Sequence, residues 1–235
     1  MPEQLTHYGS SSSIYAHRTA IALLEAKAEY THYEVDFKNK PDWFVNINPA
    51  GKVPAITYGG PKVAPDAPSP ESTKLAESAV LLEFIADLYP SSGLMPLDPI
   101  QRAKARFIIN LVDTVLFPAM LAWMIQGGSA EGVAGALKTL QAHLPEAGRG
   151  KYAVNGDFTI ADAALAPFYA RILMIAERGL HKKGKEYASD ILVALARPEF
   201  SKVKEYGERL LARPSVYESW DEDKTLAYMT KAIMG

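Results

Sequence analysis

The chain has 235 residues, of which 48% are hydrophobic and 22% charged, and its 25 basic and 27 acidic side chains give a net charge of −2. This is the composition of an ordinary globular protein, and it offers no basic surplus that would indicate nucleic acid or an anionic membrane as the main partner. Cysteine is absent, which excludes disulfides, thiolate metal sites and any mechanism in which the protein supplies a thiol.

The compartment that we expect is the cytoplasm. The first residues, Met-Pro-Glu-Gln-Leu-Thr-His, lack the basic and apolar regions of a signal peptide. The most apolar stretch, 111–125, contains Asp113 and Pro118 and is too short to cross a bilayer, so we predict that it forms a buried helix. The lack of cysteine also fits a reducing compartment.

Residues 1–89 alternate between short strand-like and helix-like segments. The segment 33–37 alternates apolar and polar residues as a strand does, and 78–89 has its apolar residues at helical spacing. Prolines 61, 65, 68 and 70 favour an irregular loop over 59–73. The expected elements are strand 5–8, helix 14–28, strand 33–37, loop 39–51, strand 53–58, strand 74–76 and helix 78–89.

Residues 90–99 hold three prolines and a glycine, and we interpret them as a linker. Beyond them the chain has the pattern of helices alone, and Thr159 and Asp162 match a capping box at the start of one helix. The sequence therefore predicts an α/β domain over 1–89 followed by an all-α domain over 100–235. The expected helices of the second domain are 100–126, 130–145, 160–179, 185–196, 199–212 and 215–232.

Five motifs occur in one order along nearly the whole chain. Together they resemble the cytosolic glutathione transferases, and within them the omega-like group, which includes fungal members with serine at the active position. This resemblance implies that the first domain is thioredoxin-like and binds glutathione, and that the second is a helical bundle. The motifs are Ser13-Ile14-Tyr15-Ala16-His17-Arg18, Lys40-Pro41-Asp42-Trp43-Phe44, Asn48-Pro49-Ala50-Gly51-Lys52-Val53-Pro54, Glu77-Ser78 and Phe158-Thr159-Ile160-Ala161-Asp162.

The resemblance assigns a turn to the middle of glutathione and a cation to one of its ends. A Val53–Pro54 turn with a cis peptide bond lets the valine N–H and C=O pair with the cysteinyl backbone. In the omega pattern the glycyl carboxylate pairs with the lysine before Pro-x-Trp-Phe, here Lys40, and Lys52 is a second candidate. Taken singly, either lysine is an ordinary solvated surface charge.

The other end of glutathione needs partners for an ammonium and a carboxylate. Glu77 and Ser78 come at the start of a helix, where backbone N–H groups and the serine hydroxyl can hold the γ-glutamyl carboxylate. The Glu77 carboxylate can pair with the ammonium. On its own, a serine at a helix start is most often only an N-cap, and the same holds for Ser13.

Ser13 takes the place that a cysteine followed by proline has in the omega pattern, and Ile14 follows it here. A hydroxyl cannot form a mixed disulfide, but it can donate a hydrogen bond to the glutathione sulfur at a helix N-terminus. Lowering a thiol pKa from about 8.5 by two units takes roughly 2.7 kcal/mol, which such contacts can supply. We predict that Ser13 stabilises the thiolate, although the assignment within residues 10–13 stays open, and that His17 is a surface or packing residue.

A hydrophobic second substrate is expected between the domains, where aromatic and methionine side chains offer flat and adaptable walls. Residues with the same spacing are also typical of a helical core. The candidates for this wall are Tyr15, Phe117, Met120, Leu121, Trp123, Met124, Tyr169 and Leu173.

Three functions remain open at this point. The first is a detoxifying transferase that conjugates glutathione, its co-substrate, to hydrophobic electrophiles. The second is a ligandin-like binder of aromatic or polyphenolic compounds with weak catalysis, and the third is a glutathione-dependent aryl-ether lyase. We expect no metal, no nucleic acid and no membrane as partners. The resemblance also implies a homodimer through the helices at 78–89 and 100–126.

Overall fold

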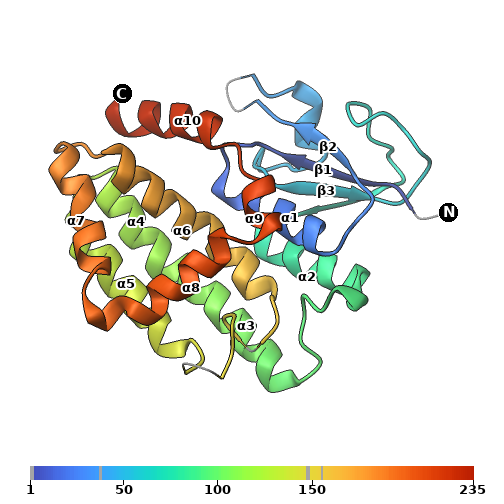
Figure 1. Cartoon of the computed structure of the whole chain (residues 1–235). Helices are drawn as coiled ribbons and strands as arrows, with labels where there is room; N and C mark the ends of the chain where they lie inside the picture. Colours follow the sequence, from blue (N-terminus) through green and yellow to red (C-terminus); the bar gives the residue numbers. More distant parts are fainter. Residues whose placement is uncertain (1–2, 37–38, 147–148, 155) are drawn as a thin grey trace.

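The computed structural model describes residues 3–36, 39–146, 149–154 and 156–235 (Figure 1). Its first part contains a four-stranded mixed sheet in the order β2-β1-β3-β4. β1 pairs with β2 in parallel, whereas β1 with β3 and β3 with β4 are antiparallel. Helices α1 and α2 pack together on one face of this sheet. The elements are β1 (Leu5–Gly9), α1 (Ile14–Glu25), β2 (Thr31–Glu34), η1 (Asp42–Asn46), β3 (Ala55–Tyr58), β4 (Thr73–Ala76) and α2 (Ser78–Leu88).

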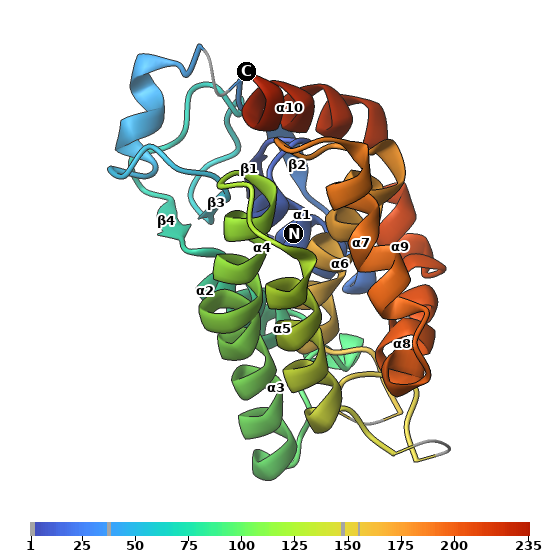
Figure 2. The same cartoon turned by 90° about the vertical axis from the view of Figure 1, so that its left-hand side faces the viewer.

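The second part is helical throughout its regular structure, and α6 runs through its centre (Figure 2). α6 is buried along most of its length and contacts α1, α3, α7 and α8. The elements are η2 (Pro90–Ser92), α3 (Pro99–Leu111), the π-helical η3 (Val112–Leu116), α4 (Phe117–Met124), α5 (Ala130–His143), α6 (Ile160–Arg178), α7 (Lys185–Leu195), η4 (Pro198–Phe200), α8 (Ser201–Leu211), α9 (Pro214–Glu218) and α10 (Glu222–Met234).

The predicted fold class is confirmed: a thioredoxin-like α/β part precedes a helical part. The capping box is also confirmed. The Thr159 hydroxyl accepts from a backbone N–H in the first turn of α6, and the Asp162 carboxylate accepts from the backbone N–H of Thr159. The domain bounds 1–89, 90–99 and 100–235 stay a prediction. One continuous buried cluster includes Leu5, Ile21 and Leu81 from the first part and most of the helical core, so the two parts are packed against each other as one unit.

Several predicted bounds were wrong for local reasons. The first helix ends at Glu25 and not at 28, because Lys27 takes a left-handed conformation with φ of 49°. The second strand begins at Thr31 and ends at Glu34, and Phe37 lies outside the described residues. The segment 215–232 forms two helices, because Asp221 caps the start of α10 through a bond from Lys224 N–H.

The segment 99–124 is one continuous helix built from α3, η3 and α4, and it is longer than the apolar stretch that the sequence suggested. By length and composition alone it could cross a membrane. Val112, Leu116 and Trp123 along it are fully buried against the other helices. The predicted helix therefore contributes to the core, but it is not buried all round, because less than half of its most apolar window is buried and Thr114 and Pro118 are exposed.

Candidate functional site

Ser13 is the N-cap of α1. Its Oγ accepts a hydrogen bond from the N–H of Ala16 at 3.1 Å, and its backbone N–H donates to Ser10 O at 2.9 Å. Because the hydroxyl acts as an acceptor here, its proton remains available for a second partner. The N–H groups of Ile14 and Tyr15 have no acceptor among the described residues. This helix start therefore offers donors, and partial positive charge, to an anion.

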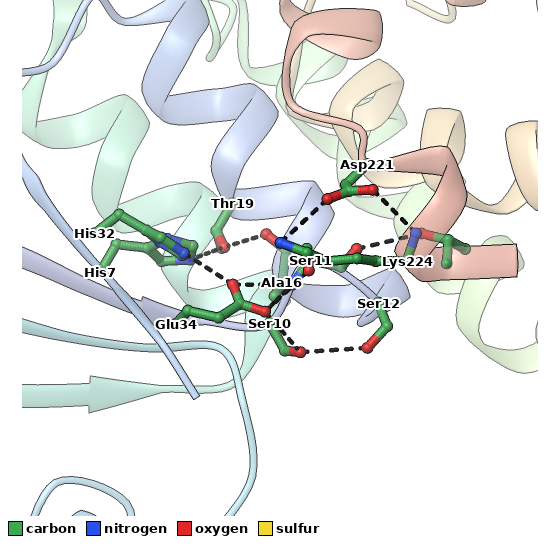
Figure 3. Close-up of polar contacts among 11 residues, drawn as sticks. His7, Ser10, Ser11, Ser12, Ala16, Thr19, His32, Glu34, Asp221 and Lys224 are labelled. Atoms are coloured by element: carbon green, nitrogen blue, oxygen red, sulfur yellow. Dashed lines mark hydrogen bonds and ion pairs between the residues drawn. The ribbon is translucent and has the colours of Figure 1, made fainter. Parts of the chain in front are cut away.

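We call residues 10–13 the serine loop. The hydroxyls of Ser10, Ser11 and Ser12 have hydrogen-bond partners among the described residues (Figure 3). Ser11 donates from Oγ to Glu34 at 2.9 Å, and Ser10 donates from Oγ to the same carboxylate at 3.3 Å. Ser12 Oγ lies 3.3 Å from Ser10 Oγ. Since Ser13 has its proton free, it is the best candidate of the four to donate to a bound sulfur.

The peptide bond between Val53 and Pro54 is cis, as predicted. Asn48 braces this turn, because it donates from Nδ2 to Lys52 O at 2.7 Å and accepts from Ala50 N–H at 3.1 Å. Neither the N–H nor the C=O of Val53 makes a backbone hydrogen bond with another described residue. The turn thus presents one free donor and one free acceptor to an extended peptide.

Glu77 precedes α2 with φ of 69°, a left-handed conformation that a non-glycine residue rarely adopts. Such a conformation is often found at a functional site. The next residue, Ser78, is buried and accepts from Arg18 Nη1 at 3.3 Å. Glu77 is exposed, so its carboxylate is open to a ligand beside the helix start.

The Val53–Pro54 turn, the start of α2 and Tyr15 of α1 border one cleft of about 410 Å³. It brings together five of the residues predicted to bind glutathione and two of those predicted to bind a hydrophobic substrate. Ser13 and Lys40 are not among the described residues that line it, and Lys40 is exposed. The cleft is lined by Tyr15, Asn48, Lys52, Val53, Pro54, Glu77, Ser78, Ala79, Asp113 and Phe117.

Asp113 is a cleft residue that sequence reasoning missed. Its Oδ1 accepts from Arg18 Nη2 at 2.7 Å, and a third of its side chain is exposed. Arg18 is fully buried and also donates to Ala164 O at 3.0 Å. The only sequence signal was an acidic residue inside an apolar stretch, and the pairing could not be predicted because Arg18 and Asp113 are 95 positions apart.

One wall of the cleft is aromatic. The rings of Tyr15 and Phe117 meet edge to face at 5.7 Å, and both contact Phe168 in the same way. Burial raises the pKa of the Tyr15 hydroxyl, because it disfavours the charged phenolate. Tyr15 is therefore a neutral, partly apolar surface near the polar end of the site.

The other residues predicted for this wall do not line the cleft. Trp123 is fully buried and donates from Nε1 to Tyr187 O at 3.3 Å. Tyr169 packs so closely on α8 that a Cβ on Gly207 would lie 2.1 Å from its ring. Six of the predicted residues are absent from the described cleft lining, the buried ones because they fill the helical core. These are Met120, Leu121, Trp123, Met124, Tyr169 and Leu173.

His17 is a packing residue, as predicted. It is buried, its Nε2 lies 3.2 Å from Val216 O and 3.0 Å from Ser219 Oγ, and its Nδ1 accepts from Arg171 Nη1 at 3.2 Å. Burial, with the nearby charge of Arg171, lowers the pKa of His17 to about 3. The ring is therefore neutral near neutral pH and has both nitrogens engaged. In the described chain no group of three or more His, Cys, Asp or Glu residues could hold a metal ion.

Comparisons with known proteins lead to one family. A family model described as "Glutathione S-transferase, N-terminal domain" matches residues 12–88. Glutathione S-transferase U25 of Arabidopsis thaliana is 31% identical over 166 residues, which cover 67% of this chain and 68% of that protein.

Two solved structures from Trametes versicolor are similar over almost the full length. Glutathione transferase Omega 1C has a TM-score of 0.93 and 42% identity, with 99% of this chain and 98% of that chain covered. Glutathione transferase Omega 2S in complex with 2,4-dihydroxybenzophenone has a TM-score of 0.90 and 42% identity, with 98% and 100% covered.

Proposed function

Because this chain belongs to the glutathione S-transferase family and is omega-like, we propose that it conjugates glutathione to hydrophobic electrophiles, with the Ser13 hydroxyl as the group that stabilises the bound thiolate. The observation that carries the role of Ser13 is its hydrogen bonding. Its oxygen accepts from Ala16 N–H while its proton stays free.

In this proposal the cleft holds glutathione as the co-substrate. The N–H and C=O of Val53, in the turn closed by Pro54, pair with the cysteinyl backbone. Glu77 and the helix start at Ser78 hold the γ-glutamyl end, and Lys52 pairs with the glycyl carboxylate. Lys52 is favoured over Lys40 because it lines the same cleft as Val53 and Glu77. Asp113 adds a second carboxylate near the γ-glutamyl ammonium.

The chemistry is a substitution or addition at the electrophile by the glutathione sulfur. The cysteinyl thiol loses its proton to solvent, and the Ser13 O–H together with the free N–H groups at the start of α1 stabilises the resulting anion. A single donor of this kind is typically worth 100-fold or more, about 2.7 kcal/mol. The electrophile stacks on the wall formed by Tyr15 and Phe117.

A ligandin-like role is the second candidate, and one observation favours it. Trametes glutathione transferase Omega 2S, 42% identical to this chain, was solved with 2,4-dihydroxybenzophenone, a hydroxylated aromatic compound. Binding of such compounds by this chain would use the same aromatic wall. The aryl-ether lyase stays a prediction without an observation that favours it.

The test combines binding with turnover. A thermal-shift titration with glutathione should raise the unfolding temperature, because a ligand that binds the native state stabilises it. Ser13→Ala should then lower kcat for a model electrophile by about 100-fold. Ser12→Ala, the matched control, should keep kcat within about twofold. Glutathione binding without turnover, combined with tight binding of a polyphenol, would favour the ligandin role.

A homodimer in the cytoplasm is part of the proposal. Val80 on α2 and Ile100 and Phe107 on α3 are exposed apolar residues, and Arg106 and Glu83 pair between these two helices at 2.6 Å. Exposed apolar residues on two helices joined by an ion pair are suited to contact with a second copy. Sedimentation analysis of the chain and of Phe107→Glu checks the assembly.

A further inference from the structure

Glu34 is the residue that holds the serine loop in place. Its carboxylate accepts from Ser11 N–H at 2.9 Å, from Ser11 Oγ at 2.9 Å and from Ser10 Oγ at 3.3 Å (Figure 3). Ser10 in turn accepts the backbone N–H of Ser13 at 2.9 Å. One side chain at the end of β2 therefore accepts hydrogen bonds from two residues of the loop immediately before Ser13.

Thr19, His7, His32 and Glu34 form a row of hydrogen-bonded side chains, and the donors and acceptors in this row indicate which atoms carry the protons. Thr19 donates its one hydroxyl proton to Ala16 O at 2.9 Å, so it accepts from His7 Nε2, which is 2.8 Å away. His7 is buried, and desolvation together with the positive charge of His32 lowers its pKa to about 3. Its ring is therefore neutral, with a proton on Nε2 and a lone pair on Nδ1.

The lone pair of His7 requires a donor opposite. His32 Nδ1 lies 3.2 Å from His7 Nδ1, so the proton between them belongs to His32. On its other side, His32 Nε2 lies 3.1 Å from Glu34 Oε2, an acceptor that needs a second proton on the same ring. These partners are all satisfied when both ring nitrogens of His32 donate, which is the arrangement that the proposal below uses.

We propose that Glu34, oriented by a doubly protonated His32, is a positioning residue that holds the serine loop so that the Ser13 hydroxyl faces the glutathione sulfur. This inference rests on the proposed function. It assigns a role to the pair His7 and His32, which lie opposite each other in register on β1 and β2. Buried His7 orients the exposed ring of His32, and His32 in turn orients the carboxylate of Glu34.

The surroundings of this pair contain few other charged groups. Glu34 has a lowered pKa: burial acts to raise it, and the hydrogen bonds from Ser11 and His32 outweigh burial. On the far side of the loop, Asp221 and Lys224 at the start of α10 pair with each other at 3.2 Å, and Thr225 donates to Ser11 O at 3.3 Å. The titratable groups that share a pocket of about 220 Å³ with His32 and Glu34 are His7, His17, Tyr30 and Glu218.

The His32–Glu34 pair is nearly half exposed, so its ion pairing contributes little to global stability. We expect the His32–Glu34 pair to affect the geometry of the serine loop instead. Displacing a catalytic donor by about 1 Å typically costs up to 100-fold in rate. Glutathione affinity should change little, because Lys52, Val53 and Glu77 contact the rest of the tripeptide from other elements.

The first experiment measures catalysis. Glu34→Gln and His32→Asn should each lower kcat about tenfold while the KM for glutathione stays within about twofold. Glu29→Gln, an exposed carboxylate just before β2, and His143→Asn, an exposed histidine on α5, are the matched controls and should leave kcat unchanged. A kcat within twofold of the original protein in both test variants would overturn the proposal, as would an equal loss in the controls.

The second experiment needs no activity, so it separates this inference from the proposed function. Nitrogen-15 NMR of the full chain at the assay pH should show protons on both ring nitrogens of His32. Glu34→Ala should speed amide exchange of Ser11 and leave the exchange of α6 unchanged. One unprotonated nitrogen on His32, or unchanged exchange of Ser11, refutes the network even if the protein conjugates glutathione. Intact NMR signatures in a chain that never binds glutathione would refute the proposed function instead.

Discussion

Arg18 on α1 and Asp113 in η3 form an ion pair of 2.7 Å between the two parts of the molecule, with the guanidinium fully buried and the carboxylate one-third exposed to the cleft. The same guanidinium lies over the rings of Tyr15 and Phe168 at 5.0 and 4.7 Å. It therefore connects the aromatic wall, the Ser78 hydroxyl and the acidic side of the cleft. We expect a change in the packing between α1 and α6 to alter the cleft through this one residue.

The first prediction tests this pair. Asp113→Asn should lower the free energy of unfolding by about 2 kcal/mol, because a buried guanidinium loses its charged partner while the shape of the side chain is kept. Urea denaturation measures the change. Glu83→Gln, which breaks the exposed pair with Arg106, is the control and should cost less than about 1 kcal/mol. Equal losses in both variants would contradict a special role for the buried pair.

The second prediction concerns the chemistry at position 13. Since the chain has no cysteine, any mixed disulfide formed by Ser13→Cys must be at that position. Its thiolate should attack one sulfur of oxidised glutathione, form a mixed disulfide and release the other glutathione as a thiolate, because the helix start lowers the pKa of a thiol there. Intact-protein mass spectrometry detects the adduct. If Ser12→Cys reacts faster, the active position within the serine loop is 12 and not 13.

The third prediction is a loss of stability in acid. Burial lowers the pKa of both His7 and His17 from 6.5 to about 3. The unfolded chain binds these protons below pH 6.5 and the native protein does not, so the stabilisation is complete above the unfolded value and is lost as pH falls toward 3. His17→Gln should flatten the decline by about 1 kcal/mol or more between neutral pH and pH 5. His143→Gln, an exposed change, should leave the slope as it is.

The fourth prediction concerns Asp162 at the start of α6. Its carboxylate accepts from the N–H groups of Ala153 and Thr159, the Thr159 hydroxyl and the Tyr206 hydroxyl, all at 2.7 to 2.9 Å. Asp162→Ala should lower the free energy of unfolding by about 3 kcal/mol or more, because these buried donors lose their acceptor. Thr159→Ala should cost about 1 kcal/mol, the usual loss of an N-cap. Chemical denaturation of both variants gives the comparison, and a loss in Asp162→Ala no larger than in Thr159→Ala would contradict it.

Local patterns were enough for much of the fold. Apolar spacing located the helices, and turn residues separated the strands, because both depend on residues within a few positions of each other. Where the bounds were wrong, the cause was a single residue, such as the left-handed Lys27 or the capping Asp221. These features were present in the sequence, but their conformation is set by packing.

The helix 99–124 shows what the spacing of apolar residues cannot predict. Phe117 and Trp123 lie on the same continuous helix, and the first lines the cleft while the second is fully buried. A pattern of apolar residues predicts that a helix has buried faces, but not which neighbour covers each face. For Trp123 the neighbours come from the region of α7, because its Nε1 donates to Tyr187 O and its ring lies beside that of His181.

By itself the sequence determined the order of the elements and the division into an α/β part and a helical part, because these depend on local spacing. Glutathione entered only through the resemblance that the motifs carry. Only the tertiary structure decided which serine keeps a free proton, which carboxylates border the cleft, and that Glu34 accepts hydrogen bonds from the serine loop. Those answers depend on contacts between residues far apart in the chain, such as Arg18 with Asp113 and Thr225 with Ser11, and no local pattern specifies them.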